Sequence, residues 1–290
     1  MGLPSDTAAS VPTGDDLLGR TVTTLEGCRW ITAEINYQVD LFGRQLSGKG
    51  DYREERSGPI PKVRMDLKIP LGGDRMGTMV QVCDGRYLWT YRRLFDEKLT
   101  RVDMRRLAQA LDSGSDRTVV SPLTCTIGMG GVAGLLRELR NHFAFEVVGQ
   151  ADLRGQRVWV LHGRWLPERL AAVMPDRKDA ILRGDKVELG KLPGHLPERV
   201  LLFLGVEHLF PYRIEYRRPA AGRDEDSFQP LNTSDRPGVT MEFLWVSMNV
   251  PIRESDFEYR PGDIEVSDAT ESFLKRIEAE TKRGAERVGP

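Results

Sequence analysis

The sequence predicts a mainly β protein (α+β) in which a curved antiparallel sheet carries short helices on its apolar face. Three observations predict it. Hydrophobic and polar side chains alternate with a period of two along several segments. The predicted strands follow one another directly and are separated by Gly-, Pro- and Asp-containing turns. No strand–helix–strand repeat occurs, so a parallel sheet is not indicated.

The first half of the chain begins with a helix and continues with strands. A helix over residues 15–27, capped by Asp15 or Asp16, carries its apolar side chains on one face. From Ile31 to Leu41 apolar and polar residues alternate, which predicts a half-buried strand of unusual length. The clearest alternation runs from Val63 to Leu71 and predicts another strand of the same kind.

Later segments extend this pattern to about ten strands, judged from alternation and turn signals. The pair Asp84-Gly85 predicts a tight hairpin between two of them. Shorter helices are predicted over residues 103–111 and 132–142, and a final helix over residues 268–282. The sequence therefore places helices at the start, the middle and the end of one sheet.

One domain is expected from residue 15 to residue 282. Residues 1–14 are predicted to form a disordered tail and residues 283–290 a charged tail. Residues 166–198 contain four prolines and too few apolar residues for a core of their own. We interpret them as an insertion between strands and not as a second domain.

The composition excludes several classes of protein. The 290 residues include 42 Lys+Arg and 43 Asp+Glu, and no basic block indicates nucleic-acid binding. No apolar run reaches the roughly 18 residues of a membrane-spanning helix. Met1 to Gly14 lacks the apolar centre of a signal peptide, so the chain is either cytosolic or an exported protein whose signal was removed and replaced by a start Met.

The reactive residue types form no recognisable catalytic or metal site. Cys28, Cys83 and Cys125 are best interpreted as small buried hydrophobes, with one disulfide and a free thiol as the alternative. The four histidines lack metal-ligand spacing, and no cofactor is indicated; these residues are His142, His162, His195 and His208.

Sequence motifs give no better support for an enzyme. Residues 128–131 are glycine-rich but lack the Lys-Ser/Thr of a phosphate loop, and they suit a flexible joint between helices. Glu54 and Glu55 are interpreted as solvated surface, like the other acidic pairs. We therefore expect no enzyme; a hydrolase would need a nucleophile and a base brought together only by the fold.

An apolar sheet face of this length needs a cover. The predicted helix over residues 103–111 carries about four apolar side chains, so burial at ~25 cal/mol per Å² holds it by only a few kcal/mol. A lipid tail would be able to displace such a lid. The alternative is a fully packed core without a cavity.

Four stretches together resemble a known family. They are the strand that begins Trp30–Ile35, the segment Gly48–Arg53, the hairpin Val82–Tyr91, and the closing segment Asn249–Ile252 with Asp256–Gly262. In order and spacing, from about residue 17 to residue 268, they are similar to the LolA-like periplasmic lipoprotein-carrier family (outer-membrane lipoprotein-sorting protein), in a larger variant.

The resemblance implies an unclosed antiparallel β-barrel with a helical lid over an apolar cavity. It also implies non-enzymatic binding of the acyl chains of lipoproteins or lipids by a monomeric carrier in the periplasm, with peripheral membrane contact. Arg56 is the nearest positional match to the arginine that latches the lid in that family, although Ser57 replaces the proline that follows it there. Residues 166–198 depart from the small carriers and indicate another ligand or a sensing role.

The apolar strand faces are expected to line the cavity, with Leu107 and Leu111 on the lid. A one-residue slip of register would reverse any of these faces. The alternative function is an envelope signalling or scaffold module that binds a protein partner on the same fold. The expected lining residues are Ile35, Tyr37, Val39, Leu67, Ile69, Val82, Trp89, Phe145 and Phe243.

Overall fold

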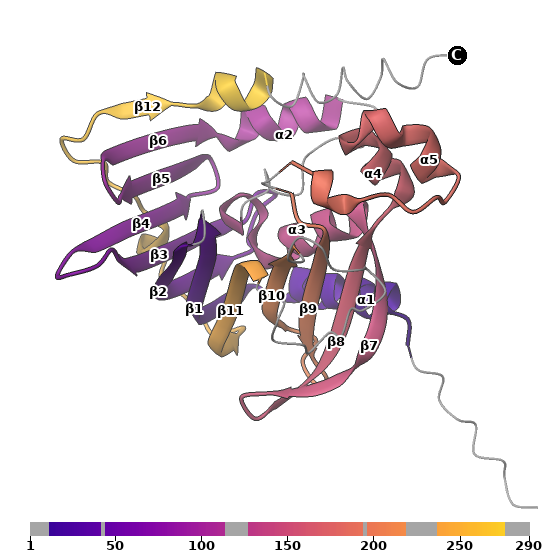
Figure 1. Cartoon of the computed structure of the whole chain (residues 1–290). Helices are drawn as coiled ribbons and strands as arrows, with labels where there is room; N and C mark the ends of the chain where they lie inside the picture. Colours follow the sequence, from indigo (N-terminus) through magenta and orange to yellow (C-terminus); the bar gives the residue numbers. More distant parts are fainter. Residues whose placement is uncertain (1–11, 42–43, 114–126, 194–195, 219–236, 276–290) are drawn as a thin grey trace, which may run out of the picture.

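The computed structural model describes residues 12–41, 44–113, 127–193, 196–218 and 237–275 (Figure 1). The strands are β1 (Trp30–Leu41), β2 (Arg44–Glu55), β3 (Lys62–Pro70), β4 (Met76–Cys83), β5 (Tyr87–Arg93), β6 (Glu97–Asp103), β7 (Phe143–Leu153), β8 (Gln156–Trp165), β9 (Arg199–Gly205), β10 (Pro211–Arg217), β11 (Pro237–Met248) and β12 (Val266–Asp268). The α-helices are α1 (Gly14–Gly27), α2 (Met104–Ser113), α3 (Ile127–His142), α4 (Pro167–Val173) and α5 (Lys178–Leu182).

The strands form one 12-stranded sheet in the order β12-β6-β5-β4-β3-β2-β1-β11-β10-β9-β8-β7. Consecutive hairpins build each half, and β1 pairs with β11 to join the halves through a register from Ile31–Met248 to Val39–Val239. All neighbours are antiparallel except β12, which runs parallel to β6. The strands at the two ends of the sheet, β12 and β7, do not pair with each other, so the sheet is not closed into a barrel. The predicted fold class, an unclosed antiparallel sheet, is confirmed.

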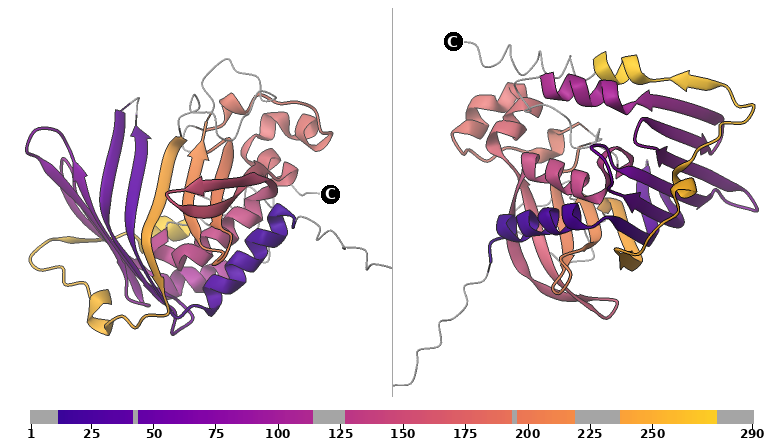
Figure 2. Two further views of the ribbon diagram at one scale, coloured as in Figure 1. Left: turned by 90° about the horizontal axis from the view of Figure 1, so that it is seen from below. Right: turned by 180° about the vertical axis from the view of Figure 1, so that it is seen from behind.

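Helices α1 and α3 lie side by side on the concave side of the sheet (Figure 2). Leu18 and Leu25 of α1 and Leu136 and Leu139 of α3 are completely buried in one core with both halves of the sheet. The predicted first helix is confirmed, with a different cap. The Thr13 hydroxyl accepts a hydrogen bond from the Asp16 amide at 3.1 Å.

Asp15 forms a tertiary contact and does not cap its own helix. Its carboxylate accepts a hydrogen bond from the Phe145 amide at 3.0 Å, which ties the start of α1 to the start of the edge strand β7. This amide faces outward at the sheet edge, where no neighbouring strand supplies a carbonyl to accept its hydrogen bond. The cap prediction was therefore wrong because the side chain serves a tertiary contact that the local sequence does not show.

The C-terminal part of the chain crosses the convex face of the first half of the sheet. Arg64 of β3 donates hydrogen bonds at 3.3 Å to the carbonyls of Asp256 and Glu258. Phe257, in the short 3-10 helix η4 (Glu254–Phe257), is buried there. The chain then reaches β12, a strand of three residues that is too short to show an alternating pattern.

The segment between β8 and β9 packs onto the main core. Leu170, Ala171 and Ile181 of α4 and α5 are buried in the same cluster as the sheet and the long helices. Two 3-10 helices, η1 (Pro175–Arg177) and η2 (Leu189–Lys191), complete this segment. Within the part of the chain that the structure describes, no helix is long and apolar enough to cross a bilayer.

Candidate functional site

The concave face has a closed half, where helices cover the sheet. Ile35, Leu67 and Phe243 are at most 1% exposed and belong to the core beneath α1 and α3. Phe243 also packs edge-on against Tyr52, with ring centroids 5.6 Å apart. Ile69 and Phe145 are buried in the same core. The structure thus brings these five predicted residues together, in a region filled by protein.

The apolar face continues along β1 to described side chains that are only half-buried, and we call this part of the face the open half. Tyr37 and Val39 follow Ile35 on the same face of β1 and are half-buried. Val39 lies between Leu46 of β2 and Val239 of β11, which are also apolar and half-buried. Burial raises the pKa of the Tyr37 phenol, as expected beside apolar neighbours. On the concave face, Tyr37 and Val39 are the predicted lining residues whose described side chains remain partly exposed.

Val82 and Trp89 lie on the other face of the sheet, which corrects their expected place in the cavity. Val82 pairs with Arg64, whose side chain holds the segment that crosses the convex face. Trp89 stacks on Tyr259 of that segment at a centroid distance of 5.6 Å. The convex face is apolar here because the C-terminal segment covers it, so hydrophobicity alone does not mark the concave side.

The predicted lid helix is present as α2. Leu107 is buried in the core, whereas the side chain of Leu111 lies outside the described residues. The Asp103 carboxylate accepts hydrogen bonds from the amides of Arg105 and Arg106 at 3.0 and 3.2 Å, as expected of a cap. Arg106 also forms an ion pair at 2.7 Å with Glu271, so the C-terminal part of the chain helps to hold this helix in place.

The stability of the region around β12 is expected to depend on pH through the carboxyl of Asp268. Hydrogen bonds from Thr270 and Arg101 lower the pKa of the Asp268 carboxyl from 3.8 to about 2. A lowered folded-state pKa gives stability that is complete above the unfolded value and is lost as the pH falls toward about 2. We expect the protection factors of the β12 amides, which are corrected for intrinsic exchange, to fall over this acid range, and Asp268→Asn to abolish that fall. Unchanged pH dependence in the variant would contradict the assignment.

A buried ion pair joins β2 to α3. Glu54 is 0% exposed, and one of its carboxylate oxygens lies 2.5 Å from Arg56 Nη2. The other oxygen accepts hydrogen bonds from the Tyr52 hydroxyl at 2.5 Å and from the Val132 amide at 3.1 Å. Arg56 Nη2 also donates to the Gly130 carbonyl at 3.1 Å. We call Tyr52, Glu54 and Arg56 the helix clamp.

The helix clamp acts where α3 is broken. Gly131 has φ 64° and ψ −168°, a backbone conformation that is essentially restricted to glycine. The Val132 amide is the first of a new helical segment, and the Glu54 carboxylate satisfies it as a cap would. A Cβ at Gly131 would lie 2.3 to 2.5 Å from the carboxylate atoms of Glu54. The predicted glycine joint between helices therefore exists, packed against a buried charge.

Sequence reasoning missed Glu54. It was interpreted as solvated because it stands in a charged run, but it is completely buried, and Glu55 is buried too. The available signal was its phase, since Glu54 follows Gly50 and Tyr52 at the spacing of two that marks the inward face. Arg56, expected to contact the lid, does reach a helix on this face, which is α3 and not α2.

Within the described residues, no three His, Cys, Asp or Glu side chains are placed to hold a metal ion. Cys28 and Cys83 are buried free thiols, in line with their interpretation as small hydrophobes, while Cys125 lies outside the described residues. Burial raises the pKa of Cys83 to about 11, which leaves little thiolate near neutral pH.

The histidine on the sheet is paired. His162 Nδ1 lies 3.1 Å from the Glu146 carboxylate, and burial lowers the pKa of the imidazole.

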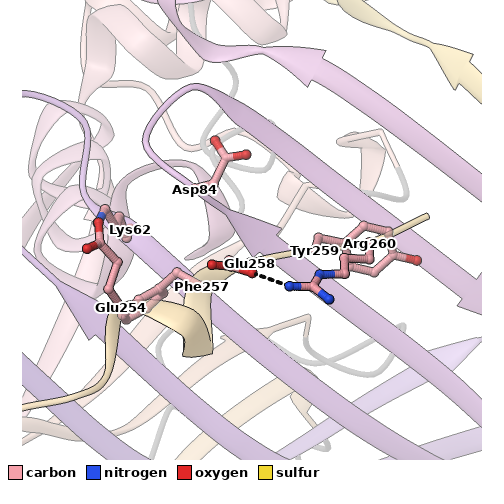
Figure 3. Close-up of a pocket in the computed structure, with 7 residues that line it drawn as sticks. All are labelled: Lys62, Asp84, Glu254, Phe257, Glu258, Tyr259 and Arg260. Carbon is pink, nitrogen blue, oxygen red and sulfur yellow. Dashed lines mark hydrogen bonds and ion pairs between the residues drawn. The ribbon is translucent and has the colours of Figure 1, made fainter. Parts of the chain in front are cut away.

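A surface pocket of about 300 Å³ lies where the C-terminal segment crosses the convex face (Figure 3). Its charged side chains pair with one another, as in Lys62 with Glu254 at 2.8 Å and Arg260 with Glu258 at 3.0 Å. The predicted lining residues do not contribute to it. It is separate from the concave face.

No family model matches the chain, and no curated protein matches it. Solved structures are similar to it at low identity. LprF from Mycobacterium bovis has 9% identity and a TM-score of 0.40, over 86% of this chain and 100% of that chain. The MucA/MucB complex from Pseudomonas aeruginosa has 12% identity and a TM-score of 0.40, over 85% of this chain and 60% of that chain.

A putative outer membrane lipoprotein-sorting protein domain from Vibrio parahaemolyticus is also similar, with 10% identity and a TM-score of 0.33, over 91% of this chain and 98% of that chain. At these identities and TM-scores, the likeness carries no information about the ligand of this protein.

Proposed function

We propose that the protein binds acyl chains of lipids or lipoproteins on the open half of its concave face and carries them, without a chemical step, in the cell envelope. The observation that supports this is the row of half-buried apolar side chains that continues the core beyond α1 and α3, including Tyr37, Val39, Leu46 and Val239. An apolar concavity of this kind suits a hydrophobic ligand.

The energetics are sufficient for carriage. Each buried methylene contributes about 0.8 kcal/mol, so about ten methylenes on this face supply roughly 8 kcal/mol before the entropic cost of association. That corresponds to affinity of at most the micromolar range. Reversible loading and release, which a carrier needs, fit this range better than tight retention.

A longer chain would need part of the closed half. Leu136 and Leu139 of α3 fill that region, so the helix would have to move. We propose Arg56 as the latch, because its guanidinium holds the Gly130 carbonyl before the break at Gly131. Arg56 Nε is buried without an acceptor among the described residues, so the latch is incompletely satisfied in this closed state.

The test places a charge on each face of one strand. We expect Val39→Asp to weaken binding of a fluorescent fatty acid at least about tenfold, because it puts a carboxylate in the apolar site. The matched control Gln38→Asp lies on the opposite face of β1, is also half-buried, and should leave the affinity unchanged. Equal affinities of wild type and Val39→Asp would exclude the concave face as the site.

A second candidate function is protein binding, as an envelope signalling or scaffold module. The observation that favours it is the edge of β7, an 11-residue strand that pairs with β8 alone among the described residues and that α1 covers only at its start, near Phe145. An extended segment of a partner would add to such an edge. Gln150→Pro should abolish capture of a protein partner while leaving fatty-acid binding intact. A wild-type chain that binds fatty acid but captures no partner would favour the carrier.

A further inference from the structure

Two sulfur atoms from distant parts of the chain meet where the first helix ends. Cys28 is the C-cap residue of α1, and Met248 is the last residue of β11. The Sγ atom of Cys28 lies 3.9 Å from the Sδ atom of Met248, although 220 positions separate the two residues in the sequence. Cys28 is 6% exposed and Met248 is half-buried, so the contact lies at the rim of the core. We call these two residues the sulfur pair.

Regular structure fixes both members of the sulfur pair. The Cys28 amide donates a hydrogen bond to the Leu25 carbonyl at 3.1 Å, which closes the last turn of α1. The Asn249 amide, directly after Met248, donates to the Trp30 carbonyl at 2.8 Å and continues the pairing of β11 with β1. A site built on helices and strands holds its donor atoms more precisely than a site on loops. The spacing of the two sulfurs is therefore a property of the folded chain.

The side chain of Asn249 is aimed at the thiol. Its Nδ2 donates toward Cys28 Sγ at 3.9 Å, while its Oδ1 accepts a hydrogen bond from the Arg29 amide at 2.9 Å. An N–H donor of this kind favours the charged thiolate over the thiol. Burial raises the pKa of Cys28, whereas the nearby charges of Glu54 and Arg56 act on it in opposite directions. The sulfur therefore keeps its proton until a ligand displaces it.

We infer that the sulfur pair binds one Cu(I) ion. A thiolate and a thioether are soft ligands, and such ligands select this ion in proteins. A bond from a metal ion to a thiolate sulfur is roughly 2.3 Å long, so two such bonds across a separation of 3.9 Å enclose an angle of roughly 120° at the metal. That is the angle of a three-coordinate site, and its third position is left for a small ligand from solvent. Binding at this site does not depend on what the concave face carries.

Charge and ligand number favour a monovalent ion. A thiolate with Cu(I) forms a neutral centre, which is less costly to bury than one that carries net charge. Zn²⁺ takes four ligands in a structural site, and Mg²⁺ and Ca²⁺ take oxygen ligands. Among the residues that the structure describes, no three His, Cys, Asp or Glu side chains converge to supply them. Binding transfers the Cys28 proton to solvent as the metal–sulfur bond forms, and neither sulfur is oxidised.

The experiment titrates the reduced full chain with Cu(I) in the absence of oxygen, against a chromophoric Cu(I) chelator. Cys125→Ser in every protein removes the thiol that lies outside the described residues. We expect one ion to be bound per chain, with an apparent affinity that rises about tenfold per pH unit, because one proton leaves for each ion bound. The bound ion joins α1 to β11, so it should also raise the midpoint of thermal unfolding.

Two variants remove one sulfur each. Cys28→Ala should abolish the binding, and Met248→Leu, which keeps the side-chain volume, should weaken it at least about tenfold. The matched controls Cys83→Ala and Met76→Leu remove sulfurs outside the pair and should bind as the wild type does. A wild-type chain that loses every ion to the chelator overturns the inference. Wild-type affinity in either Cys28→Ala or Met248→Leu overturns it as well.

Discussion

Replacing Glu54 by Gln is expected to lower the free energy of unfolding by about 3 kcal/mol, because it breaks a buried ion pair and leaves Arg56 without its counter-charge. The carboxylate also accepts hydrogen bonds from the Tyr52 hydroxyl and the Val132 amide. A glutamine has one carbonyl oxygen and cannot meet three donors at once. Urea unfolding followed by circular dichroism measures the loss.

Glu258→Gln is the matched control for this change. Its ion pair with Arg260, at 3.0 Å, lies on the surface with both side chains exposed. Removing such a pair changes stability by less than about 1 kcal/mol. If Glu54→Gln were as mild as Glu258→Gln, the helix clamp would not stabilise the closed state, and its role as a latch would have to be abandoned.

Gly131→Ala is expected to be the most destabilising single change in α3, with a loss of about 4 kcal/mol. Its φ and ψ are accessible almost only to glycine, which alone costs another residue about 1 to 3 kcal/mol. The new methyl group would in addition overlap the Glu54 carboxylate, at 2.3 Å from its nearest oxygen. Packing of this kind costs a further ~1 to 3 kcal/mol.

Gly134 is the control within the same helix. An added Cβ there meets nothing within 4 Å, and its φ is not positive. Gly134→Ala should therefore stabilise the protein by about 0.5 to 1 kcal/mol, since alanine favours the helix. A double-mutant cycle separates the two causes at Gly131, because Glu54→Ala removes the overlap but leaves the backbone strain. Equal effects of alanine at positions 131 and 134 would contradict the break in α3.

The helix clamp also bears on ligand uptake. If the helix clamp holds α3 closed, then Arg56→Met should speed the uptake of a long-chain fatty acid while lowering stability. Uptake at the wild-type rate in a folded Arg56→Met protein would show that α3 does not limit access to the concave face.

Much of the fold is predictable because secondary structure is local. The alternation in β1 and β3, the hairpin after Cys83 and the helix over residues 132–142 were all predicted with errors of a few residues at their ends, apart from the extra turn of α3 before Gly131. The three-residue strand β12 was not predicted, because its pairing with β6 comes from a contact between distant parts of the chain.

The candidate site is predictable only in part. The spacing of two places Ile35, Tyr37 and Val39 on one face of β1, and that relation holds in the structure. It does not say which face of the next strand continues the same surface, since each turn resets the phase. For that reason Val82 and Trp89, although apolar and correctly assigned to strands, lie on the convex side.

The sequence by itself determined the strands, their two faces and the breaks between helices, because these depend on neighbours within a few residues. Only the tertiary structure decided that the C-terminal segment covers the convex face and that Glu54 is buried against Gly131. It also decided that Ile35 is completely buried on the concave face whereas Val39 is half-buried. These features depend on which distant segments meet, and burial of a side chain is a property of that meeting rather than of its local pattern.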